Sequence, residues 1–560
     1  MRILGFAGGF GHDASAALLV DGRVAALVEE ERLRRRKYAR GESAELAALA
    51  CARMANIDLA DIDIVATAWD SSRDPSNGRM RLADEQLRTS SLLGALRTNA
   101  KWYAFDHHQC HAVAAYFCAR MQTPAIVLVM DGRGETCSTS AHMVSGSHIE
   151  TLATSSLVAS IGTFYGAATE YCGFGYGGQG KTMGLAPYGQ PTFEFAEFRS
   201  SGFGVTVDWA RSMIRSDDLT SSHRRVYEAW KARFRQVFGP AREFQPRLDA
   251  RSLNMEPNSG FDQRHADAAA SAQSTVERLV GQLVGNLSES YPGVPIVVAG
   301  GVALNCAANG RLRTMYGDVS LHFLPIPHDA GTSMGAALMA ARAQNQDLVL
   351  DFQPYLGTGW TDAEITAILA TLGLSYSEPA DLPEAVAQLI MDGRVVAWFQ
   401  GRAEVGPRAL GHRSILANAY DVDTKLRLNT GLKYRESWRP FGPSVLQSDM
   451  KDLFGVSHSP FMIEAFEMEP SYRGSLAAVC HVDGTSRPHS VEQGVTSERY
   501  VGLLESIRQT TGTGVVLNTS FNVGAEPIVY SPVDAIRTFY ASAVDALAIG
   551  PFILRKSSSR

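Results

Sequence analysis

The chain has 560 residues and an ordinary globular composition, with 45% hydrophobic and 20% charged residues. This length predicts two or more domains, and this composition excludes a disordered, collagen-like or coiled-coil protein. The formal net charge of −6 argues against a nucleic-acid binder. Seven cysteines without a C-x-x-C pair indicate a reduced compartment, and no apolar run approaches the roughly 20 residues of a membrane span, so we expect a cytoplasmic protein.

Two similar strand-rich stretches lie in the first part of the chain. Residues 2–30 predict strand, glycine-rich loop, strand, Asp-Gly turn and strand, because Asp-Gly between β-rich runs favours a hairpin. Residues 124–155 repeat this order around a Ser-Gly turn, which indicates an internal repeat. Helical patterns at 43–55 and 266–290 alternate with these strands and with a strand at 294–299, which predicts an α/β fold. Two such halves would resemble the duplicated actin/hexokinase-like (ASKHA) fold.

The chain turns polar around 343–360 and gathers proline and glycine there. We therefore predict two domains, 1–350 and 351–560. Strand patterns in the second part, among them RVVAWFQ, GVVLNTSF and DALAIGPFIL, predict a separate α/β core.

The stretch GYGGQGKTMGLAPYG (175–189) satisfies the spelling of a P-loop, G-x-x-x-x-G-K-[ST]. A P-loop follows a buried strand and opens a long helix, whereas FYGAATEYCGF precedes this stretch and Gly184, Pro187 and Gly189 follow it. This context excludes a P-loop fold. Two alternatives remain: a flexible surface turn, or a loop whose glycines let the backbone approach a ligand, with Lys181 in reach of a phosphate.

The segment DHHQCHAVAAYF (106–117) places His107 and His111 four residues apart, so that on a helix both lie on one face. Asp131 ends an apolar strand in AIVLVMDGRGE, and Asp329 lies in a loop before a small-residue helix. Imidazoles combined with carboxylates suit Fe(II), Mn(II) or Zn(II). The spacing by itself is also compatible with histidines that only support the fold.

Basic residues of the second part lie between glycines and prolines rather than in charge runs. Guanidinium groups suit multidentate phosphate recognition, so we expect an anion pocket here. Its candidates are Arg408, Arg413, Lys433, Arg435 and Arg439, with Arg487 and the polar strand end 517–522. A separate basic run, 32–40, is either a solvated helix face or a strip that guides phosphate or faces an acceptor.

Ordered motifs along the whole chain resemble the nodulation and antibiotic O-carbamoyltransferases, whose metal domain is similar to the one that makes threonylcarbamoyl-tRNA. The motifs are HDASAALLVDGRVAALVEEER, HHQCHAVAAY, MDGRGE, GGQGKTMGLAPYG, AGGVALN and PHDAGTSMGAA, followed by segments that resemble the YrdC-like domain of that family. The resemblance implies that His12 acts on the acceptor hydroxyl, and that iron is bound by His107, His111, Asp131 and Asp329. The chain departs from the family at Tyr38, where histidine is common.

The resemblance also implies three ligand-binding sets. In the metal domain, the nucleotide set is Asp131, Gly132, Glu170, Gly178, Gly180, Lys181, Gly300, Gly301, Asn305 and Asp329. In the YrdC-like domain, carbamoyl phosphate is assigned to Arg408, Lys433, Arg439, Arg487 and Asn518. ATP in that domain is assigned to Arg413, Arg435, Ser520 and Asn522.

The implied activity is an ATP-dependent transfer of the carbamoyl group of carbamoyl phosphate, through carbamoyl-adenylate, to a hydroxyl of an antibiotic-type small molecule. The implied cofactors are Fe(II), or Mn or Zn in its place, with Mg for ATP. We expect no nucleic acid or membrane partner, and a homodimer is one option. Few family motifs fall in 71–100 and 190–265, so we expect acceptor specificity there.

Three other functions stay open. A threonylcarbamoyl-type tRNA modification enzyme shares both domain types, but it would be expected to carry a basic face for tRNA. A sugar kinase or ATPase would leave the arginine-rich second part unexplained. A scaffold without enzymatic activity would bind neither metal nor nucleotide.

Overall fold

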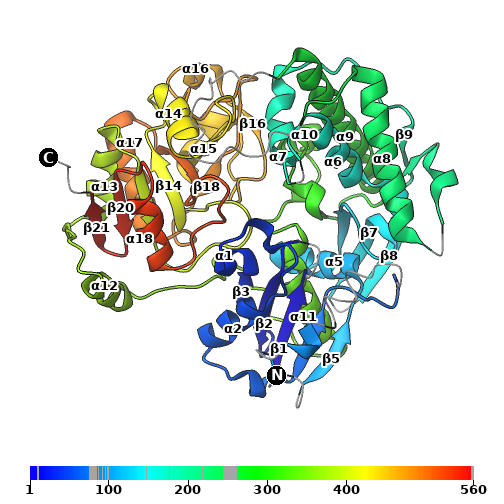
Figure 1. Cartoon of the computed structure of the whole chain (residues 1–560), viewed down its shortest axis with the longest axis horizontal. Helices are drawn as coiled ribbons and strands as arrows, with labels where there is room; N and C mark the ends of the chain where they lie inside the picture. The colour runs from blue at the N-terminus through cyan, green and yellow to red at the C-terminus, as the bar shows by residue number, and fades with distance from the viewer. Residues whose placement is uncertain are drawn as a thin grey trace. The chain divides into compact units, whose positions relative to one another are not determined.

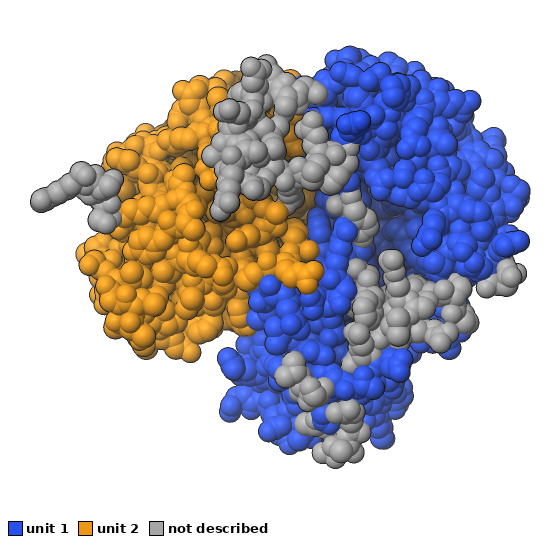
Figure 2. Space-filling view, viewed as in Figure 1, with its two compact units in different colours: residues 1–34, 38–251, 260–353 blue, residues 35–37, 252–259, 354–560 orange. Residues whose placement is uncertain are grey.

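The computed structural model describes residues 1–8, 12–74, 85, 87–90, 93–94, 96, 100–146, 148–175, 177–215, 218–243 and 261–556. This part of the chain divides into two compact units, coloured separately in Figure 2. Unit 1 contains Met1–Arg34 and the described residues of 38–353, and unit 2 contains Arg35–Lys37 and 354–556. The main division falls after Gln353, close to the boundary predicted at 350.

Unit 1 contains two five-stranded sheets with the same strand order (Figure 1). In each sheet three successive strands pair antiparallel, and two later strands continue the sheet in parallel on the other side of the first strand. The sequence repeat predicted from 2–30 and 124–155 is therefore a repeat of topology. The first sheet is β3 (Arg23–Glu29), β2 (Ser15–Val20), β1 (Arg2–Ala7), β4 (Ile64–Thr67) and β5 (Lys101–Ala104). The second sheet is β8 (His148–Ser156), β7 (Cys137–Ser145), β6 (Ala125–Met130), β11 (Ile296–Ala299) and β12 (Leu321–His322).

The central strands and one small-residue helix position the site of unit 1. All six residues of β6 are buried, as expected for an apolar strand that is covered on both faces. Helix α11, rich in alanine, packs against both α5 and β1. The helices of unit 1 are α1 (Glu30–Arg34), α2 (Glu45–Met54), α5 (His107–Cys118), α6 (Ile161–Tyr171), α7 (Gln179–Leu185), α8 (Leu219–Phe238), α9 (Gln263–Ser290), α10 (Cys306–Met315) and α11 (Thr332–Ala343), beside the hairpin β9 (Phe198–Ser201) and β10 (Gly204–Val207).

Unit 2 is built on a mixed seven-stranded sheet. Successive residues of its strands contribute to different buried clusters, Ala397 to one and Trp398 to the other, because side chains alternate across a strand. The sheet thus has a core on each face. Its strands, in spatial order, are β18 (His489–Val491), β15 (Gly442–Leu446), β19 (Val515–Ser520), β14 (Arg413–Ala417), β13 (Val396–Phe399), β20 (Ala546–Ile549) and β21 (Phe552–Arg555).

Helices and a two-stranded pair complete unit 2. The helices are α12 (Asp362–Thr371), α13 (Leu382–Met391), α14 (Asp423–Gly431), α15 (Gln447–Phe454), α16 (Pro470–Arg473), α17 (Glu498–Thr511) and α18 (Pro532–Tyr540), and the pair is β16 (Phe466–Glu467) with β17 (Thr485–Ser486). The stretch DALAIGPFIL forms two strands rather than one, because the chain reverses at Gly550, which has a φ of +55°. Among the helices of the described residues, none has both the length and the apolar character that crossing a membrane requires.

Candidate active site

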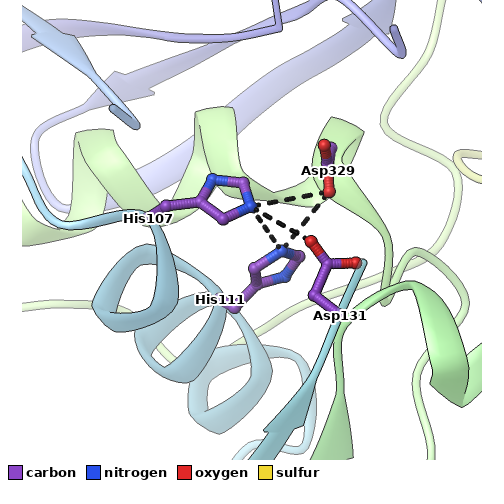
Figure 3. Close-up of side chains that lie close together, drawn as sticks. All are labelled: His107, His111, Asp131 and Asp329. Atoms are coloured by element: carbon purple, nitrogen blue, oxygen red, sulfur yellow. Dashed lines mark hydrogen bonds and ion pairs between the residues drawn. The ribbon is translucent and has the colours of Figure 1, made fainter. Parts of the chain in front are cut away.

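Four side chains from three elements meet in unit 1 (Figure 3). His107 and His111 lie on one face of α5, Asp131 follows β6, and Asp329 begins the short helical turn before α11. One donor atom of each residue lies within 4.8 Å of the others. The structure thus brings together the four residues that the sequence singled out as metal ligands.

The distances within this cluster fit a shared ion. The Nε2 atoms of His107 and His111 are 3.2 Å apart, and His107 Nε2 lies 3.5 Å from Oδ2 of Asp131. Both Nε2 atoms lie 3.6 Å from Oδ1 of Asp329. Two ligands that each lie about 2.1 Å from one ion are about 3.0 to 3.4 Å apart. The donor types and their spacing therefore suit a divalent metal ion after only a small inward adjustment.

The electrostatics of the cluster point the same way. Burial lowers the pKa of His107, but the charges of Asp329 and Asp131 outweigh it and hold that pKa well above 6.5. Burial raises the pKa of Asp329, but His107 and His111 lower it to well below 3.8. Without a metal, a proton on His107 thus balances the carboxylates. A metal ion competes with that proton for the same position.

The backbone around α5 fixes the orientation of His107. Its Nδ1 lies 3.1 Å from the carbonyl oxygen of Ala68, so a proton on Nδ1 is bonded there and Nε2 faces the cluster. The buried carboxylate of Glu135 accepts from the backbone N–H of His107 (3.0 Å) and of Asp70 (2.9 Å). The sequence reasoning did not single out Glu135, although it closes the MDGRGE motif.

The glycines of AGGVALN lie directly against the end of β6. Asp131 uses Oδ2 toward His107, and its Oδ1 accepts from the backbone N–H of Gly301 at 2.9 Å. Gly300 has a φ of +87°, and a Cβ on it would lie 2.1 Å from the carbonyl oxygen of Met130, so only glycine fits. Gly300 and Gly301 therefore border the metal cluster.

His12 follows β1 and lies beside the carboxylates. Its Nδ1 is 2.7 Å from Oδ2 of Asp13, a residue held at a strained φ of 58° by a bond from its N–H to the carbonyl of Tyr38. Burial lowers the pKa of His12, but Asp13, and then Asp329 and Asp131, raise it to about 9. A cation bound by those two carboxylates would bring this pKa back toward neutrality. Residues 9–11 of the predicted loop lie outside the described residues.

The stretch that imitates a P-loop has a different structure. Helix α6, not a strand, precedes it, and the helix within it, α7, has only seven residues. Thr182, which would ligate magnesium in a P-loop, is buried and bonded to Thr169. Gly178 caps α7, Gly180 is exposed, and Lys181 Nζ lies 5.4 Å from the ring centre of Phe174.

Two other residues of the implied nucleotide set have partners of their own. Asn305 caps α10 and exchanges two hydrogen bonds with Gln273, at 2.9 and 3.0 Å. Glu170 lies near the C-terminal end of α6 and pairs with Lys231 at 2.9 Å. Gly132 contacts the other end of α6, through its carbonyl oxygen and Ser160. The residues that the resemblance assigns to the nucleotide are therefore spread from the His107–Asp131 cluster to the far end of α6.

Lys433 is a buried cation of unit 2. Its Nζ donates to the carbonyl oxygen of Ser520 at 2.6 Å and to the carbonyl and Oδ1 oxygens of Asn522 at 3.0 and 2.8 Å. Burial and then neighbouring positive charges, Arg435 first, lower its pKa well below 10.5. Like charges therefore dominate its surroundings, which favours binding of an anion.

Arg435 and Arg439 lie near Lys433, and Arg487 lies near Arg435. Burial lowers the pKa of Arg435, and the charges of Arg439 and Arg487 lower it further against a partial offset from Glu436. Arg435 Nε donates to Oδ1 of Asn429 at 2.6 Å, which fixes the guanidinium in place. The pocket predicted from scattered arginines is thus a compact cationic cluster.

Asn518 lies on β19 and is bonded to the residue that follows Arg408. Its Nδ2 donates to the carbonyl oxygen of Ala409 and to Oγ of Ser444, both at 2.9 Å. Its buried Oδ1 has no hydrogen-bond partner within the described part of the chain. A buried acceptor without a donor is costly, so this oxygen is suited to an N–H group of a ligand.

Comparisons with known proteins follow this division of the chain. A family model described as Carbamoyltransferase N-terminus matches residues 85–338, and one described as Carbamoyltransferase C-terminus matches residues 387–556. The chain belongs to the carbamoyltransferase family. It is therefore an enzyme of carbamoyl transfer, with matched regions in both of its units.

Individual relatives agree with the family. Nodulation protein NolNO of Sinorhizobium fredii is 32% identical over 98% of this chain and 80% of the relative. A 3'-hydroxymethylcephem-O-carbamoyltransferase of Streptomyces clavuligerus is 30% identical over 52% of this chain and 54% of the relative. Among solved structures, a ROK hexokinase from Thermus thermophilus covers 62% of this chain at 15% identity, with all of its own chain included. Its TM-score of 0.33 is too low to support any conclusion.

One arginine of this carbamoyltransferase has a role other than the one implied by resemblance. Arg413 is fully buried, and its guanidinium donates to the carbonyl oxygens of Gln400 (2.6 Å), Gly401 (3.0 Å) and Thr358 (3.1 Å). It also lies 3.6 Å from the ring centre of Phe399. Because these contacts bury and engage the side chain, the structure does not support the implied contact of Arg413 with ATP.

The basic run 32–40 is not a uniform solvated face. Arg32 pairs with Glu29 at 2.7 Å, and Arg34 pairs with Glu30 at 2.8 Å. The next residues belong to unit 2, as the following contacts show.

Arg35 donates to the carbonyl oxygens of Ile528 (2.6 Å) and Pro527 (2.8 Å). Lys37 is among the cations that lower the pKa of Lys433. This short segment from the N-terminal part of the sequence therefore adds a cation, Lys37, to the surroundings of Lys433 in unit 2.

Proposed function

We propose that the enzyme is an ATP-dependent O-carbamoyltransferase that moves the carbamoyl group of carbamoyl phosphate, through carbamoyl-adenylate, to a hydroxyl of a small natural product. The observation that carries the proposal is the presence in one carbamoyltransferase chain of a His2Asp2 cluster and a cationic pocket. A cation site and an anion site suit the two halves of this reaction. The repeated strand order of unit 1 supports an actin/hexokinase-like fold, and we take unit 2 to be YrdC-like.

The pocket of unit 2 would form the activated donor. Water cleaves carbamoyl phosphate to carbamate and phosphate, and carbamate then attacks the α-phosphate of ATP to give carbamoyl-adenylate and pyrophosphate. Arg408, Arg439 and Arg487 would offset the charge on the phosphate oxygens. The unpartnered Oδ1 of Asn518 would accept from the carbamoyl NH2 group. Free carbamate is short-lived, so a buried pocket that excludes bulk water favours the second step.

Unit 1 would carry out the transfer. His107, His111, Asp131 and Asp329 would hold Fe(II), or Mn(II) or Zn(II), which when bound supplies a Lewis acid for an oxygen of the carbamoyl or phosphate group. Since Nδ1 of His12 is engaged by Asp13, we assign Nε2 of His12 as the base that takes the proton of the acceptor hydroxyl. The products would be an O-carbamoylated acceptor and AMP.

The deciding experiment uses the full-length, metal-loaded enzyme with ¹⁴C-labelled carbamoyl phosphate, Mg-ATP and a panel of hydroxylated natural products. We expect release of pyrophosphate and AMP and label in an acid-stable O-carbamoyl product. Release of ADP in place of AMP would indicate a kinase or ATPase. Label transfer that requires tRNA and threonine would indicate the tRNA-modifying alternative, and either result would overturn the proposal.

A further inference from the structure

A cavity of about 500 Å³ lies in unit 1 at the C-terminal ends of α6 and α8. Its lining includes four basic side chains, Arg40, Lys231, Arg235 and Arg242, and one carboxylate, Glu170. Arg40 and Arg235 are exposed, whereas Lys231 and Arg242 are half-buried. The cavity therefore has a strongly positive lining that is partly shielded from water.

Ring packing between α6 and α8 and an ion pair of Lys231 position one side of the cavity. Phe164 of α6 packs edge-on against Trp230 of α8, with ring centres 4.8 Å apart. Lys231 and Arg235 are four residues apart on α8 and so lie on one face of the helix. Lys231 Nζ is 2.9 Å from Glu170, and this pair, with Glu228, outweighs burial and raises the pKa of the lysine. The Lys231 charge is thus retained.

The loops on either side of the cavity are also held. The backbone N–H of Arg242 donates to the carbonyl oxygen of Tyr171 at 3.0 Å. Arg40 lies 5.9 Å from the ring centre of Tyr38, whose hydroxyl donates to the carbonyl oxygen of Gly177 at 3.0 Å. A Cβ on Gly177 would lie 2.7 Å from the Tyr38 ring, so the tyrosine packs on this loop only because a glycine is there.

Helix α6 relates the cavity to the metal cluster. At its N-terminal end, Ser160 and Thr163 donate to the carbonyl oxygen of Gly132, the residue after Asp131. Glu170 follows Thr163 by seven residues on the same helix, which is about 10 Å along its axis. The cavity and the cluster of His107, His111, Asp131 and Asp329 therefore lie toward opposite ends of α6.

The cavity is separate from most of the residues assigned to the nucleotide. Of that set only Glu170 is in the lining, whereas Lys181, Gly301 and Asn305 are not. Helix α8 and Arg242 instead belong to 190–265, where family motifs are few and acceptor specificity is expected. Residues 244–260 of that stretch lie outside the described residues.

We propose that this cavity binds an anionic group, a carboxylate or a phosphate, of the acceptor whose hydroxyl is carbamoylated at the metal cluster. The inference rests on the proposed function and adds the chemical class of the acceptor, a hydroxylated molecule that also carries a negative group. Guanidinium and ammonium groups arranged around one space bind carboxylate and phosphate oxygens by charge-assisted hydrogen bonds.

The first test measures anion binding by isothermal titration of the full-length protein with sulfate. The variant is Arg235→Gln/Arg242→Gln, and the matched control is Arg233→Gln on the same helix, which pairs with Glu197 outside the cavity lining. We expect one sulfate-binding component to weaken about tenfold or more in the double variant and to persist in the control. Identical isotherms for the double variant and wild type would overturn the proposal.

The second test distinguishes acceptor from nucleotide. The double variant should bind α,β-methylene-ATP with unchanged affinity, and parallel loss of that affinity would assign the cavity to nucleotide phosphates and overturn the acceptor assignment. With acceptors found in the labelled carbamoyl phosphate assay, we expect a rise of about tenfold in acceptor KM with little change in kcat. Accepted compounds that carry no anionic group would also overturn it.

The two proposals fail in different ways. Pyrophosphate release from carbamoyl phosphate and ATP tests the proposed function and is expected to be equal in wild type, double variant and control. Absence of pyrophosphate in all three would reject the proposed function, whereas loss of sulfate binding only in the double variant would still establish the cavity as an anion site.

Discussion

The metal cluster of unit 1 and the cationic pocket of unit 2 are opposite electrostatic designs. In the cluster, two carboxylates raise the pKa of His107, so that a proton substitutes for a metal ion. In the pocket, burial and neighbouring arginines lower the pKa of Lys433. The pKa of a histidine is raised in one site, and the pKa of a lysine is lowered in the other. Each shift indicates the sign of the ligand that would relieve it, a cation in unit 1 and an anion in unit 2.

The largest effect is expected from removing one candidate metal ligand of unit 1. His107→Ala removes one of four ligands, and we expect loss of bound metal and a fall in carbamoyl transfer of more than about a hundredfold, since even a partner behind a metal ligand is worth 10- to 100-fold. Metal content and product formation are measured together. The exposed His148→Ala on β8 is the control. If the variant releases pyrophosphate normally but no longer transfers the carbamoyl group, the two units carry out separate steps. Normal carbamoyl transfer in the variant would reject the metal site.

The second prediction concerns anion binding by the basic residues of unit 2. Arg439→Gln should raise the KM for carbamoyl phosphate about tenfold or more, because it removes charge-assisted bonds to phosphate. For wild type, phosphate at 100 times its dissociation constant should add about 2.7 kcal/mol to the free energy of unfolding. Since a tenfold weaker affinity leaves about 1.4 kcal/mol of that stabilisation, differential scanning fluorimetry should show the phosphate effect about halved in the variant, with the stabilisation by Mn(II) retained. A phosphate effect of unchanged size in Arg439→Gln would place the anion elsewhere.

The third prediction concerns pH. Metal binding must displace the proton of His107, so affinity should fall about tenfold per pH unit below the raised pKa and release about one proton. Calorimetry in two buffers of different ionisation enthalpy counts that proton.

The metal-free fold should show the opposite dependence. The His107 ion pairs stabilise it fully below the unfolded pKa of about 6.5, and that contribution is lost as pH rises through the raised folded pKa. A metal affinity independent of pH between 6 and 8 would contradict this description of the cluster.

A smaller effect is expected for Glu135, which holds the backbone of the candidate ligand His107 in place. Glu135→Gln keeps the shape of a side chain that accepts from His107 and Asp70 but removes its charge. Metal affinity should fall about tenfold, in the range typical of residues that orient ligands. Equilibrium dialysis with Mn(II) measures it, and a full loss of folding by circular dichroism would instead make Glu135 a requirement of the fold.

The smallest effect is expected for a substitution in the basic run 32–40. Arg35→Gln removes bonds to the carbonyl oxygens of Ile528 and Pro527, so the free energy of unfolding should fall by about 1 to 2 kcal/mol. The KM for ATP should rise only a few-fold. Arg36→Gln, at the neighbouring exposed position, is the control. Equal effects of both substitutions would mean that only the charge of the run matters.

Much of this arrangement could be read from local pattern. The four-residue spacing of His107 and His111 on an apolar helix, and Asp131 at the end of an apolar strand, are features of short segments. The absence of a P-loop at 175–189 also follows from nearby residues, because Gly184 and Pro187 leave room only for a short helix. Such signals depend on periodicity and turn chemistry within a few residues, which the sequence states directly.

Other features depend on segments that are far apart in the chain. Arg413 resembles its neighbours in a glycine- and proline-rich turn, yet it is fully buried and donates to the carbonyl oxygens of Gln400 and Thr358. Glu170 was grouped with the nucleotide loop but pairs with Lys231 on another helix. Nothing in the local pattern around Arg35 indicates that it contacts residues almost five hundred positions later.

By itself, the sequence indicated the two histidines and two aspartates of the unit 1 cluster, the repeated strand-rich halves and the cationic character of the second unit. Only the tertiary structure decided which charges share one space. It placed Asp329 beside His107, buried Lys433 among arginines, and gathered four basic side chains around the cavity at α6 and α8. The physical reason is that residue type is fixed locally, whereas burial and Coulomb interactions depend on distances set by packing between remote segments.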